Sequence, residues 1–455
     1  MADTATSPEN NLSQDSEYPN QKYAWYCLSI ICLAYVFGFI DRIIVGLITP
    51  AIQADIGLSD SQMGIIQGLA FALFYTLFGL PLGWAADRFN RKTLLTAGSG
   101  IWSLMTAAGG FVSSFAGLFG VRAGVGISEA TLNPCAASLI GDYFKPRTRP
   151  KAFGVYTMST AFGTVLTYLT GGAVIGFVMA NSADGSTFAL PVIGDVKAWQ
   201  AVFIIVGLGG IIPTLLLAFT VREPKRLNIS SKVGGTTPIS ETIAFIKANK
   251  MTLFCHNAGV ALVFLAVYGW INWMPSFFSR IHDWGPAQFA VTYGVFGGAA
   301  GIFSAVSSGY VSNWFKDKGY SDGVMRCVLV GCVGTTVGST IAPLMPTPGT
   351  AIAVFAITGL VVNYPPAQAL MAINEITPNQ FRGQVTAIYI LVLGLLAAGL
   401  GPFVMGWVTD NVFGDPQKIH YSMALVSGVS GTLGTFLICR SLKAYRISLS
   451  RVDWT

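Results

Sequence analysis

The chain of 455 residues is 53% hydrophobic and only 11% charged, with 52 glycines and a formal net charge of +6. A soluble domain would carry about 25% charged residues, so the composition excludes an ordinary soluble protein and predicts an integral membrane protein. The apolar runs are continuous rather than alternating, which argues against an outer-membrane barrel. The small positive charge has a simpler origin in the loops and does not indicate a nucleic-acid partner.

The first 23 residues, 1–23, are polar and lack the basic start and apolar stretch of a signal peptide. We interpret them as a disordered cytoplasmic tail. Apolar stretches that can cross a hydrocarbon core about 30 Å thick follow along the chain. They are expected near 24–48, 62–86, 94–112, 115–141, 151–180, 199–221, 251–279, 287–314, 324–346, 349–374, 383–409 and 419–439.

The longest polar interval between two spans, 222–250, falls at the middle of the chain and divides the spans into six and six. The sequence therefore predicts an N-terminal six-helix bundle over 24–221 and a C-terminal six-helix bundle over 251–443. Residues 222–250 are expected to form a cytoplasmic central loop, and residues 444–455 a cytoplasmic tail.

Basic residues are unevenly distributed across the predicted membrane. If the N-terminus is cytoplasmic, all but five of the 27 Lys and Arg residues lie on the cytoplasmic side. Three of the five lie outside (Lys197, Arg280 and Lys418), and two lie within spans (Arg42 and Arg122). By the positive-inside rule, we expect both termini in the cytoplasm and the protein in a plasma or inner membrane.

Two segments of the first half recur in the second half. GWAADRFNRK, 83–92, follows the second span, and GYVSNWFKDK, 309–318, follows the eighth, at an offset of 226 residues. DYFKPRTRPKAFGVY, 142–156, matches EITPNQFRGQVTAIY, 375–389, in an acid, an Arg and a Tyr at an offset of 233. Such duplication is usual in alternating-access carriers, in which one bundle rocks against the other around a central site.

The loop after the second span resembles the signature loop of the major facilitator superfamily, G-x-x-x-D-R-x-G-R-K. Asn90 stands where that pattern has Gly, and the matching residues are Gly83, Asp87, Arg88, Arg91 and Lys92. In the fourth span, Arg122 and Gly126 resemble the Arg-x-x-x-Gly motif of the superfamily. The resemblance covers about residues 24–443. It implies an all-α polytopic membrane protein with twelve transmembrane helices in two pseudo-symmetric six-helix bundles.

Within that superfamily, the chain looks like the spinster family. The resemblance rests on FIDR in the first span, GISEA in the fourth span, and the loop that contains Asp142 and Arg149. Members of this family move sphingosine phosphate and related lysolipids, so the resemblance implies a substrate of that kind.

Four full charges remain at membrane depth once the loops are set aside: Asp41, Arg42, Arg122 and Glu129. Asp41 lies nine residues from Pro50, near the outer end of the first span, or about 13 Å at 1.5 Å per residue. Arg122 and Glu129 are seven residues apart and therefore share one face of the fourth span. In the superfamily these two helices line the central cavity, so the resemblance implies that both pairs point into it.

Each of these charges costs roughly 2.5 to 3.5 kcal/mol near the centre of a lipid-facing helix. One interpretation is neutral pairs that only fix helix packing, such as Asp41 with Arg122 or Arg42 with Glu129. Because buried pairs stabilise less than apolar replacements, we favour a functional role.

We predict that Asp41 or Glu129 couples transport to protons, and we favour Asp41. Burial favours the neutral form of an acid, whereas a nearby Arg favours the ionised form, so a change of surroundings can switch the proton. Arg42 and Arg122 are predicted to hold the substrate headgroup, since a guanidinium binds phosphate or carboxylate with two bonds.

The spans of the second half carry no full charge near the midplane. They offer aromatic and amide side chains instead, which are predicted to line the substrate cavity: Tyr268, Asn272, Trp273, Asn363 and Tyr364. The alternative is that these side chains only pack helices together. A cavity that is charged on one wall and mainly apolar on the other suits an amphipathic anion.

Charged residues at the cytoplasmic helix ends are candidates for gating. Ion pairs between the bundles are predicted to hold the outward-open state, and the candidates are Asp87, Arg88, Arg91, Asp142 and Arg149. Solvated helix-end charges are the alternative. Glycines are predicted to allow close helix crossings at the bundle interface. In the fifth span these are Gly163, Gly171, Gly172 and Gly176, and in the eleventh Gly394, Gly399, Gly401 and Gly406.

The sequence therefore predicts a secondary transporter that moves an amphipathic anionic lipid, of sphingosine-phosphate or lysophospholipid type, by proton-coupled alternating access. The alternatives are a proton-linked carrier of small organic anions, sugars or drugs, and a non-transporting membrane receptor or scaffold. No glycine loop precedes Lys92, the only Lys followed by Ser or Thr, so a primary pump is disfavoured. We expect no enzyme activity and no metal or cofactor besides the proton gradient. The expected partners are the small substrate and membrane lipids, with the chain as a monomer.

Overall fold

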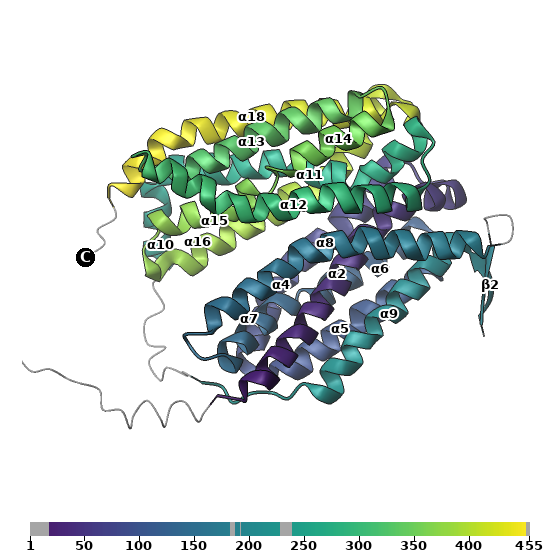
Figure 1. Ribbon diagram of the computed structural model, residues 1–455, viewed down its shortest axis with the longest axis horizontal. Coiled ribbons are helices and arrows are strands. Elements are labelled where there is room, and N and C mark those ends of the chain that lie inside the picture. Colours follow the sequence, from purple (N-terminus) through teal and green to yellow (C-terminus); the bar gives the residue numbers. More distant parts are fainter. Residues whose placement is uncertain (1–17, 183–186, 192, 228–238, 452–455) are drawn as a thin grey trace, which may run out of the picture.

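The computed structural model describes residues 18–182, 187–191, 193–227 and 239–451. Most of the tail predicted over 1–23, the middle of the predicted central loop, and the last four residues lie outside these described residues. The described chain is almost entirely helical, with one short hairpin (Figure 1).

The first half, which we call the N-half, contains the elements up to residue 220. Its helices are α2 (Gln21–Ile56), α3 (Asp60–Gly64), the π-helix η1 (Ile65–Leu69), α4 (Ala70–Arg88), α5 (Arg91–Gly109), α6 (Phe115–Glu129), α7 (Leu132–Tyr143), α8 (Arg149–Ala180) and α9 (Ala198–Thr220). Between α8 and α9, β1 (Thr187–Leu190) pairs antiparallel with β2 (Gly194–Lys197).

The second half, the C-half, follows α10 (Ile239–Ala248). It begins with α11 (Lys250–His282), α12 (Pro286–Asp317), α13 (Gly323–Ile341), the 3-10 helix η2 (Ala342–Leu344), α14 (Pro348–Gly359) and α15 (Tyr364–Ile376). It ends with α16 (Asn379–Val392), the π-helix η3 (Leu393–Gly399), α17 (Leu400–Val408), the π-helix η4 (Thr409–Phe413), the 3-10 helix η5 (Pro416–Lys418) and α18 (Ile419–Leu449).

These elements confirm the predicted fold class. Within the described residues, ten helical segments are long and apolar enough to cross a membrane, and α5 and the α6–α7 pair complete the twelve predicted spans. The predicted central loop differs in one respect, because it contains the short helix α10. Phe245 of α10 stacks on Phe381 of α16 with ring centroids 5.2 Å apart, so this contact fixes α10 on the C-half.

The fourth span of each half is broken near its middle, where α6 gives way to α7 and α14 gives way to α15. Pro134 follows the first break, and Pro365 and Pro366 follow the second. A proline lacks the N–H that would continue the hydrogen-bond ladder of the preceding turn, which explains both breaks. The internal repeat seen in the sequence therefore extends to an irregularity of the backbone.

The two halves form separate bundles that are closer together at one end than at the other (Figure 1). We call the end where α2 begins and α18 ends the tail side, and the end with the β1–β2 hairpin the hairpin side. The ribbons of the two bundles diverge toward the tail side. Contacts between the halves join α3 and η1 to α17, α4 to η3, α8 to α12, and α2 to α11.

Glycines permit some of these crossings. A Cβ atom at Gly46 of α2 would lie 2.9 Å from the carbonyl oxygen of Asn272 in α11, and one at Gly172 of α8 would lie 3.0 Å from Cβ of Ala290 in α12. Of the predicted interface glycines, Gly163 and Gly171 instead face α2 within the N-half, and Gly401 faces α11 within the C-half. Small residues therefore serve contacts both between and within the bundles.

Candidate transport site

An ion pair joins α2 and α6 at the charged positions predicted from the sequence. Nη2 of Arg42 lies 2.7 Å from Oε1 of Glu129, and Nε of Arg42 donates to the same oxygen at 2.9 Å. A Cβ atom at Gly38, one turn earlier in α2, would lie 2.8 Å from that oxygen, so Gly38 leaves room for the carboxylate. Glu129 is 1% exposed, whereas the Arg42 side chain is 27% exposed. The carboxylate of Glu129 is thus shielded from solvent, whereas the guanidinium of Arg42 is partly accessible to solvent.

Three aromatic rings surround the guanidinium of Arg42. Its Cζ lies 4.8 Å from the ring centroid of Phe71, 5.0 Å from that of Tyr75 and 5.4 Å from that of Phe39. Cation–π attraction to these rings holds the guanidinium in place without using its N–H groups. The N–H groups that Glu129 leaves free can therefore serve a ligand.

A chain of polar side chains continues from this site, which the sequence analysis missed. The hydroxyl of Tyr75 accepts a hydrogen bond from Nδ2 of Asn133 at 2.8 Å, and Oδ1 of Asn133 accepts one from the hydroxyl of Tyr156 at 2.7 Å. These bonds link α4, α7 and α8. Tyr156 was visible as one member of the internal repeat, but nothing in the sequence connected it with the buried charges.

Asp41 and Arg122 lie beside this pair but do not form an ion pair with each other. Oδ2 of Asp41 accepts a hydrogen bond from Oγ1 of Thr106 in α5 at 2.5 Å, while Nη1 of Arg122 donates to the main-chain oxygen of Asp41 at 3.1 Å. Both charged side chains are buried. Of the two pairings considered from the sequence, the structure forms Arg42 with Glu129 and joins Arg122 to Asp41 only through the backbone.

We call Asp41, Arg42, Arg122 and Glu129 the charged cluster. Some of its polar atoms have no hydrogen-bond partner in the part of the chain that the structure describes. Within the described residues, Oδ1 of Asp41, Nε of Arg122 and Oε2 of Glu129 have no hydrogen-bond partner. With both acids ionised, the four charges sum to zero, and one added proton would leave the cluster with a single positive charge. An uncompensated charge is costly in a buried site. Binding of one anion would cancel the positive charge that one added proton leaves, so the two are expected to bind together.

On the C-half, α11 brings one predicted cavity residue to the cluster. Tyr268 lies near Arg42 and Tyr75, across the contact between the two halves. Asn272, one turn later, donates from Nδ2 to the main-chain oxygen of Tyr268 at 2.8 Å and lies where α11 crosses Gly46. The C-half therefore presents a phenol and an amide, rather than a charge, at this place.

The other predicted cavity residues bond within the C-half. The side chain of Trp273 is fully enclosed, and its Nε1 donates to the main-chain oxygen of Pro402 at 2.8 Å. Nδ2 of Asn363 donates to the main-chain oxygen of Gly301 at 2.9 Å, and the hydroxyl of Tyr364 lies 3.0 Å from Oγ of Ser307. Trp273 is therefore enclosed by neighbouring helices in this structure, and its predicted place in the substrate cavity stays a prediction. A buried indole requires a partner for its N–H and finds one in the neighbouring helix.

The candidate gating residues make contacts within the N-half. Arg91 is buried and forms ion pairs with Asp142 and, from Nε at 2.7 Å, with Oε1 of Glu223. The guanidinium of Arg88 lies 4.2 Å from the ring of Trp84, and the main-chain oxygen of Asp87 accepts a hydrogen bond from an Arg side chain after α9. These bonds tie the segment after α9 to the tail-side ends of α4, α5 and α7.

Arg149, the last candidate, donates from Nε to the main-chain oxygen of Phe144 and from Nη2 to the hydroxyl of Tyr18, each at 3.4 Å. None of the recorded contacts of the five gating candidates crosses to the C-half among the described residues. Their predicted pairing concerns a state that is closed on the tail side, so it stays a prediction.

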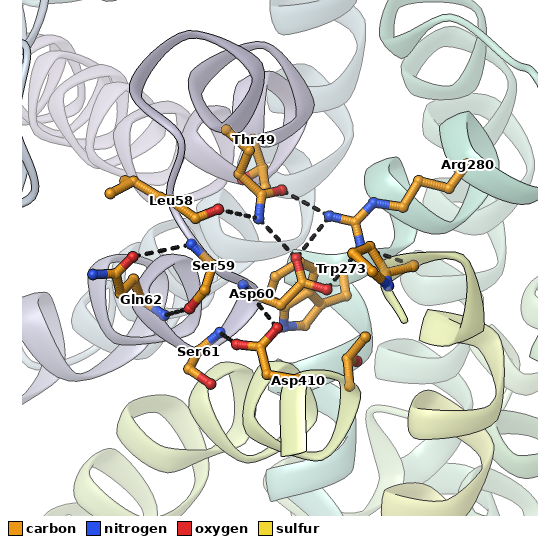
Figure 2. Close-up of polar contacts among 12 residues, drawn as sticks. Thr49, Leu58, Ser59, Asp60, Ser61, Gln62, Trp273, Arg280 and Asp410 are labelled. Carbon is orange, nitrogen blue, oxygen red and sulfur yellow. Dashed lines mark hydrogen bonds and ion pairs between the residues drawn. The ribbon is translucent and has the colours of Figure 1, made fainter. Parts of the chain in front are cut away.

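A polar network that the sequence analysis missed joins the halves at the hairpin side (Figure 2). Nη2 and Nη1 of Arg280, near the end of α11, reach Oδ1 and Oδ2 of Asp60 at 2.7 and 2.8 Å. Nη2 also donates to Oε1 of Gln53 at 2.8 Å. Asp60 is almost fully buried at the start of α3, so this two-bond pair is largely shielded from water.

Asp410 of η4 makes a second link at the same place. Its carboxylate accepts hydrogen bonds from the main-chain nitrogens of Asp60 at 3.3 Å and Ser61 at 2.7 Å (Figure 2). These are free N–H groups of the first turn of α3, where a carboxylate also interacts favourably with the helix dipole. An isolated Arg280 on the sparsely charged side was the only signal of this network in the sequence. The structure is thus closed at the hairpin side.

Two six-helix bundles with a buried charge cluster at their contact define a polytopic membrane transporter. Residues 31–402 match the Major Facilitator Superfamily, so the chain belongs to this family. It is similar to the spinster branch: Protein spinster homolog 3 of Danio rerio is 25% identical over 464 residues, covering 93% of this chain and 86% of the relative. The Hexuronate transporter of Bacillus subtilis (strain 168) is 25% identical over 394 residues, covering 83% and 86%.

A solved structure agrees with this relationship. It is the crystal structure of a bacterial homolog to the human lysosomal transporter spinster, in an inward-facing and unoccupied conformation. It matches with a TM-score of 0.77 and 26% identity, and covers 96% of this chain and 100% of that chain. The predicted family, the fold and a role in transmembrane transport are confirmed.

Proposed function

We propose that the protein moves an amphipathic anion across the membrane by proton-coupled alternating access, with the anionic head bound at Arg42. The observation that carries this proposal is the asymmetric ion pair: the guanidinium of Arg42 is open, while Glu129 behind it is buried. Tyr268 lies near Arg42 across the contact between the halves, and the spans of the C-half carry no full charge near the midplane; we propose that they form an apolar opposite wall, which suits an acyl chain.

Proton coupling follows from competition for the guanidinium. An anionic head that takes the N–H groups of Arg42 competes with Glu129, whose Oε2 already lacks a partner among the described residues. An unpaired buried carboxylate costs several kcal/mol, so the released acid takes up a proton. We therefore propose that one anion and one proton bind together. This geometry favours Glu129 over Asp41 as the proton site, because Asp41 is held by Thr106 and does not pair with the open guanidinium.

Alternating access requires the hairpin-side network to break while the tail side closes. The bonds of Arg280 with Asp60, and of Asp410 with the start of α3, join the halves at the hairpin side and must be released for that side to open. The excess of Lys and Arg supports a cytoplasmic tail side in a plasma or inner membrane. On this orientation the structure faces inward.

A second candidate is a carrier of small organic anions, which is favoured by the resemblance to a hexuronate transporter. The same guanidinium would hold a carboxylate, but the apolar wall of the C-half would then have no chain to contact.

Purified protein in liposomes separates the two candidates. We would measure uptake of sphingosine phosphate, lysophosphatidylglycerol, glucuronate and glucose with and without a pH gradient. Gradient-driven movement of the two anionic lipids, with little movement of glucuronate and glucose, is the expected result. Movement of glucuronate alone would support the second candidate, and movement of no anion would overturn the proposal.

A further inference from the structure

A hollow of about 390 Å³ lies in the C-half, away from the charged cluster. Its lining comes from α15 and the beginning of α16: Ala367, Leu370, Met371, Asn374, Glu375 and Arg382. The α15 residues recur at intervals of three and four, so they share one face of that helix. In Figure 1, α15 and α16 lie on the side of the C-half that faces the N-half, toward the tail side. We call this hollow the Arg382 slot.

Arg382 brings an uncompensated positive charge to the slot. Its Nε donates to the main-chain oxygen of Thr377 at 3.0 Å, which leaves the two terminal nitrogens without a recorded partner among the described residues. Glu375, the acid in the lining, is already engaged: its Oε1 lies 2.7 Å from Nζ of Lys316, and its Oε2 accepts a hydrogen bond from Tyr445 at 2.6 Å. The slot therefore favours an anion.

The rest of the slot is mainly apolar. Met371 is 44% exposed and lies beside Leu370 and Ala367 on the same helix face, while Asn374 adds an amide near the basic end. Ligand pockets range from about 300 to 1,000 Å³, so a hollow of this size holds a headgroup and the first part of a chain. Its chemistry therefore fits the head end of an anionic amphiphile.

Comparison with the N-half shows that the slot is not a by-product of the repeat. At the offset of 233 residues, Arg149 corresponds to Arg382, and its Nε also donates to a main-chain oxygen five residues earlier. The long side chains of Leu370 and Met371, however, correspond to the short ones of Ala137 and Ser138.

The partners of these N-half residues differ as well. Arg149 has a further bond to Tyr18, and Ser138 accepts hydrogen bonds from Arg91. The main-chain bond of the arginine is therefore common to both halves, whereas the wall of long apolar side chains and the uncommitted guanidinium belong to the C-half.

We propose that the Arg382 slot is a docking site where the anionic head of the amphiphile first binds, at the tail-side mouth, before it moves to Arg42. This inference rests on the proposed function. A basic side chain at the mouth raises the local concentration of anions and steers them inward. The apolar wall shields the first part of the chain from water during that step.

Photo-crosslinking of the full chain in liposomes tests the slot. The probe is a sphingosine phosphate analogue with a diazirine on the chain close to the head, and crosslinked peptides are located by mass spectrometry. Crosslinks within 367–374 are expected. Met371→Asp places a negative charge in the slot without touching the bond between Arg382 and Thr377, and should remove these crosslinks. Met371→Gln, the neutral control of similar length, should keep most of them.

Transport kinetics provide a second readout. Met371→Asp and Arg382→Gln should raise KM about tenfold, the loss expected for one charge-assisted hydrogen bond, with kcat nearly unchanged. Lys318→Gln removes a tail-side charge of the C-half outside the slot and should leave KM unchanged. Inorganic phosphate at the concentration of the probe should not displace it, because phosphate lacks the chain.

Crosslinks near Arg42 without any within 367–374, or crosslinks and KM that Met371→Asp leaves unchanged, would overturn the docking site while the proposed function stands. Displacement by inorganic phosphate would overturn the assignment to an amphiphile. Absence of crosslinks from the whole protein, together with absence of anion transport, would instead contradict the proposed function itself.

Discussion

The N-half and the C-half share one fold but present different chemistry where they meet. The N-half buries Asp41, Arg42, Arg122 and Glu129 in one cluster, whereas α11 of the C-half faces that cluster with Tyr268. At the tail side, Arg91 of the N-half is paired with acids, whereas among the described residues Arg382 of the C-half keeps terminal nitrogens free beside an apolar wall. Duplication has kept the scaffold, down to the broken fourth span, while the side chains of each half have specialised.

On the proposed function, the two halves make different contacts with the substrate at the buried charges: the N-half binds the headgroup at Arg42, and the C-half contacts the chain. A rocking motion of one bundle against the other then changes the surroundings of the headgroup and the chain together. Variants that alter one half alone therefore test directly whether the N-half and the C-half make these different contacts.

The largest effect is expected from Arg42→Gln, which removes the open cation of the N-half. Anion transport into liposomes should fall about 100-fold, since two charge-assisted hydrogen bonds to the head are lost. Arg440→Gln, which removes an exposed cation of the C-half, is the matched control and should transport normally. Normal transport by Arg42→Gln would remove this residue from the substrate site.

Glu129→Gln should uncouple transport from protons. Because we propose that anion and proton bind together, anion affinity in the wild type should fall as pH rises, and the neutral amide should abolish that dependence. Anion binding measured over a pH series checks this, with Asp41→Asn as the comparison. If Asp41→Asn removes the pH dependence and Glu129→Gln retains it, the proton site is Asp41.

Arg280→Gln should open the hairpin side. The change leaves the buried carboxylate of Asp60 without its two-bond partner and breaks the ion pair that joins the halves at the hairpin side. Distances between spin labels on the hairpin-side ends of α2 and α18 should lengthen or become bimodal. Asp410→Asn keeps an oxygen acceptor for α3 and should have a smaller effect; unchanged distances in both variants would refute the proposed closure.

The smallest effect is expected from Gly46→Ala, which adds a methyl group where α2 crosses α11. The new Cβ would lie 2.9 Å from the main-chain oxygen of Asn272, and overpacking of this kind costs about 1–3 kcal/mol. The melting temperature should therefore fall. Gly79→Ala, where a Cβ meets nothing within 4 Å, is the control and should melt at or above the wild-type temperature. Equal melting of both variants would contradict the tight crossing.

The sequence predicted the spans, the duplication and the buried charges because each is a local or repeated pattern. A continuous apolar run defines a span, and Asp41 is conspicuous inside one. The direction in which Asp41 points was not predictable, because it depends on how α2 is rotated toward α5. Nothing in the sequence marks Thr106 as its partner.

Pairing across the two halves was also beyond the sequence. Asp60 and Arg280 are ordinary helix-end residues until the bundles are packed together, and Asp410 becomes a cap only because η4 lies beside α3. The enclosure of Trp273 has the same origin, since it follows from the close packing of α11 against α17. Side-chain type indicates what a residue can do, whereas helix packing decides which partner it meets.

Proton movement on anion binding tests the central claim most directly. Lysophosphatidylglycerol is a suitable ligand, because its phosphodiester head does not titrate near neutral pH. It would be added to purified protein in weakly buffered solution with a pH indicator. The account predicts uptake of about one proton per ligand bound by the wild type, and none by Glu129→Gln. Release of protons, or saturable binding with no proton movement in the wild type, would contradict it.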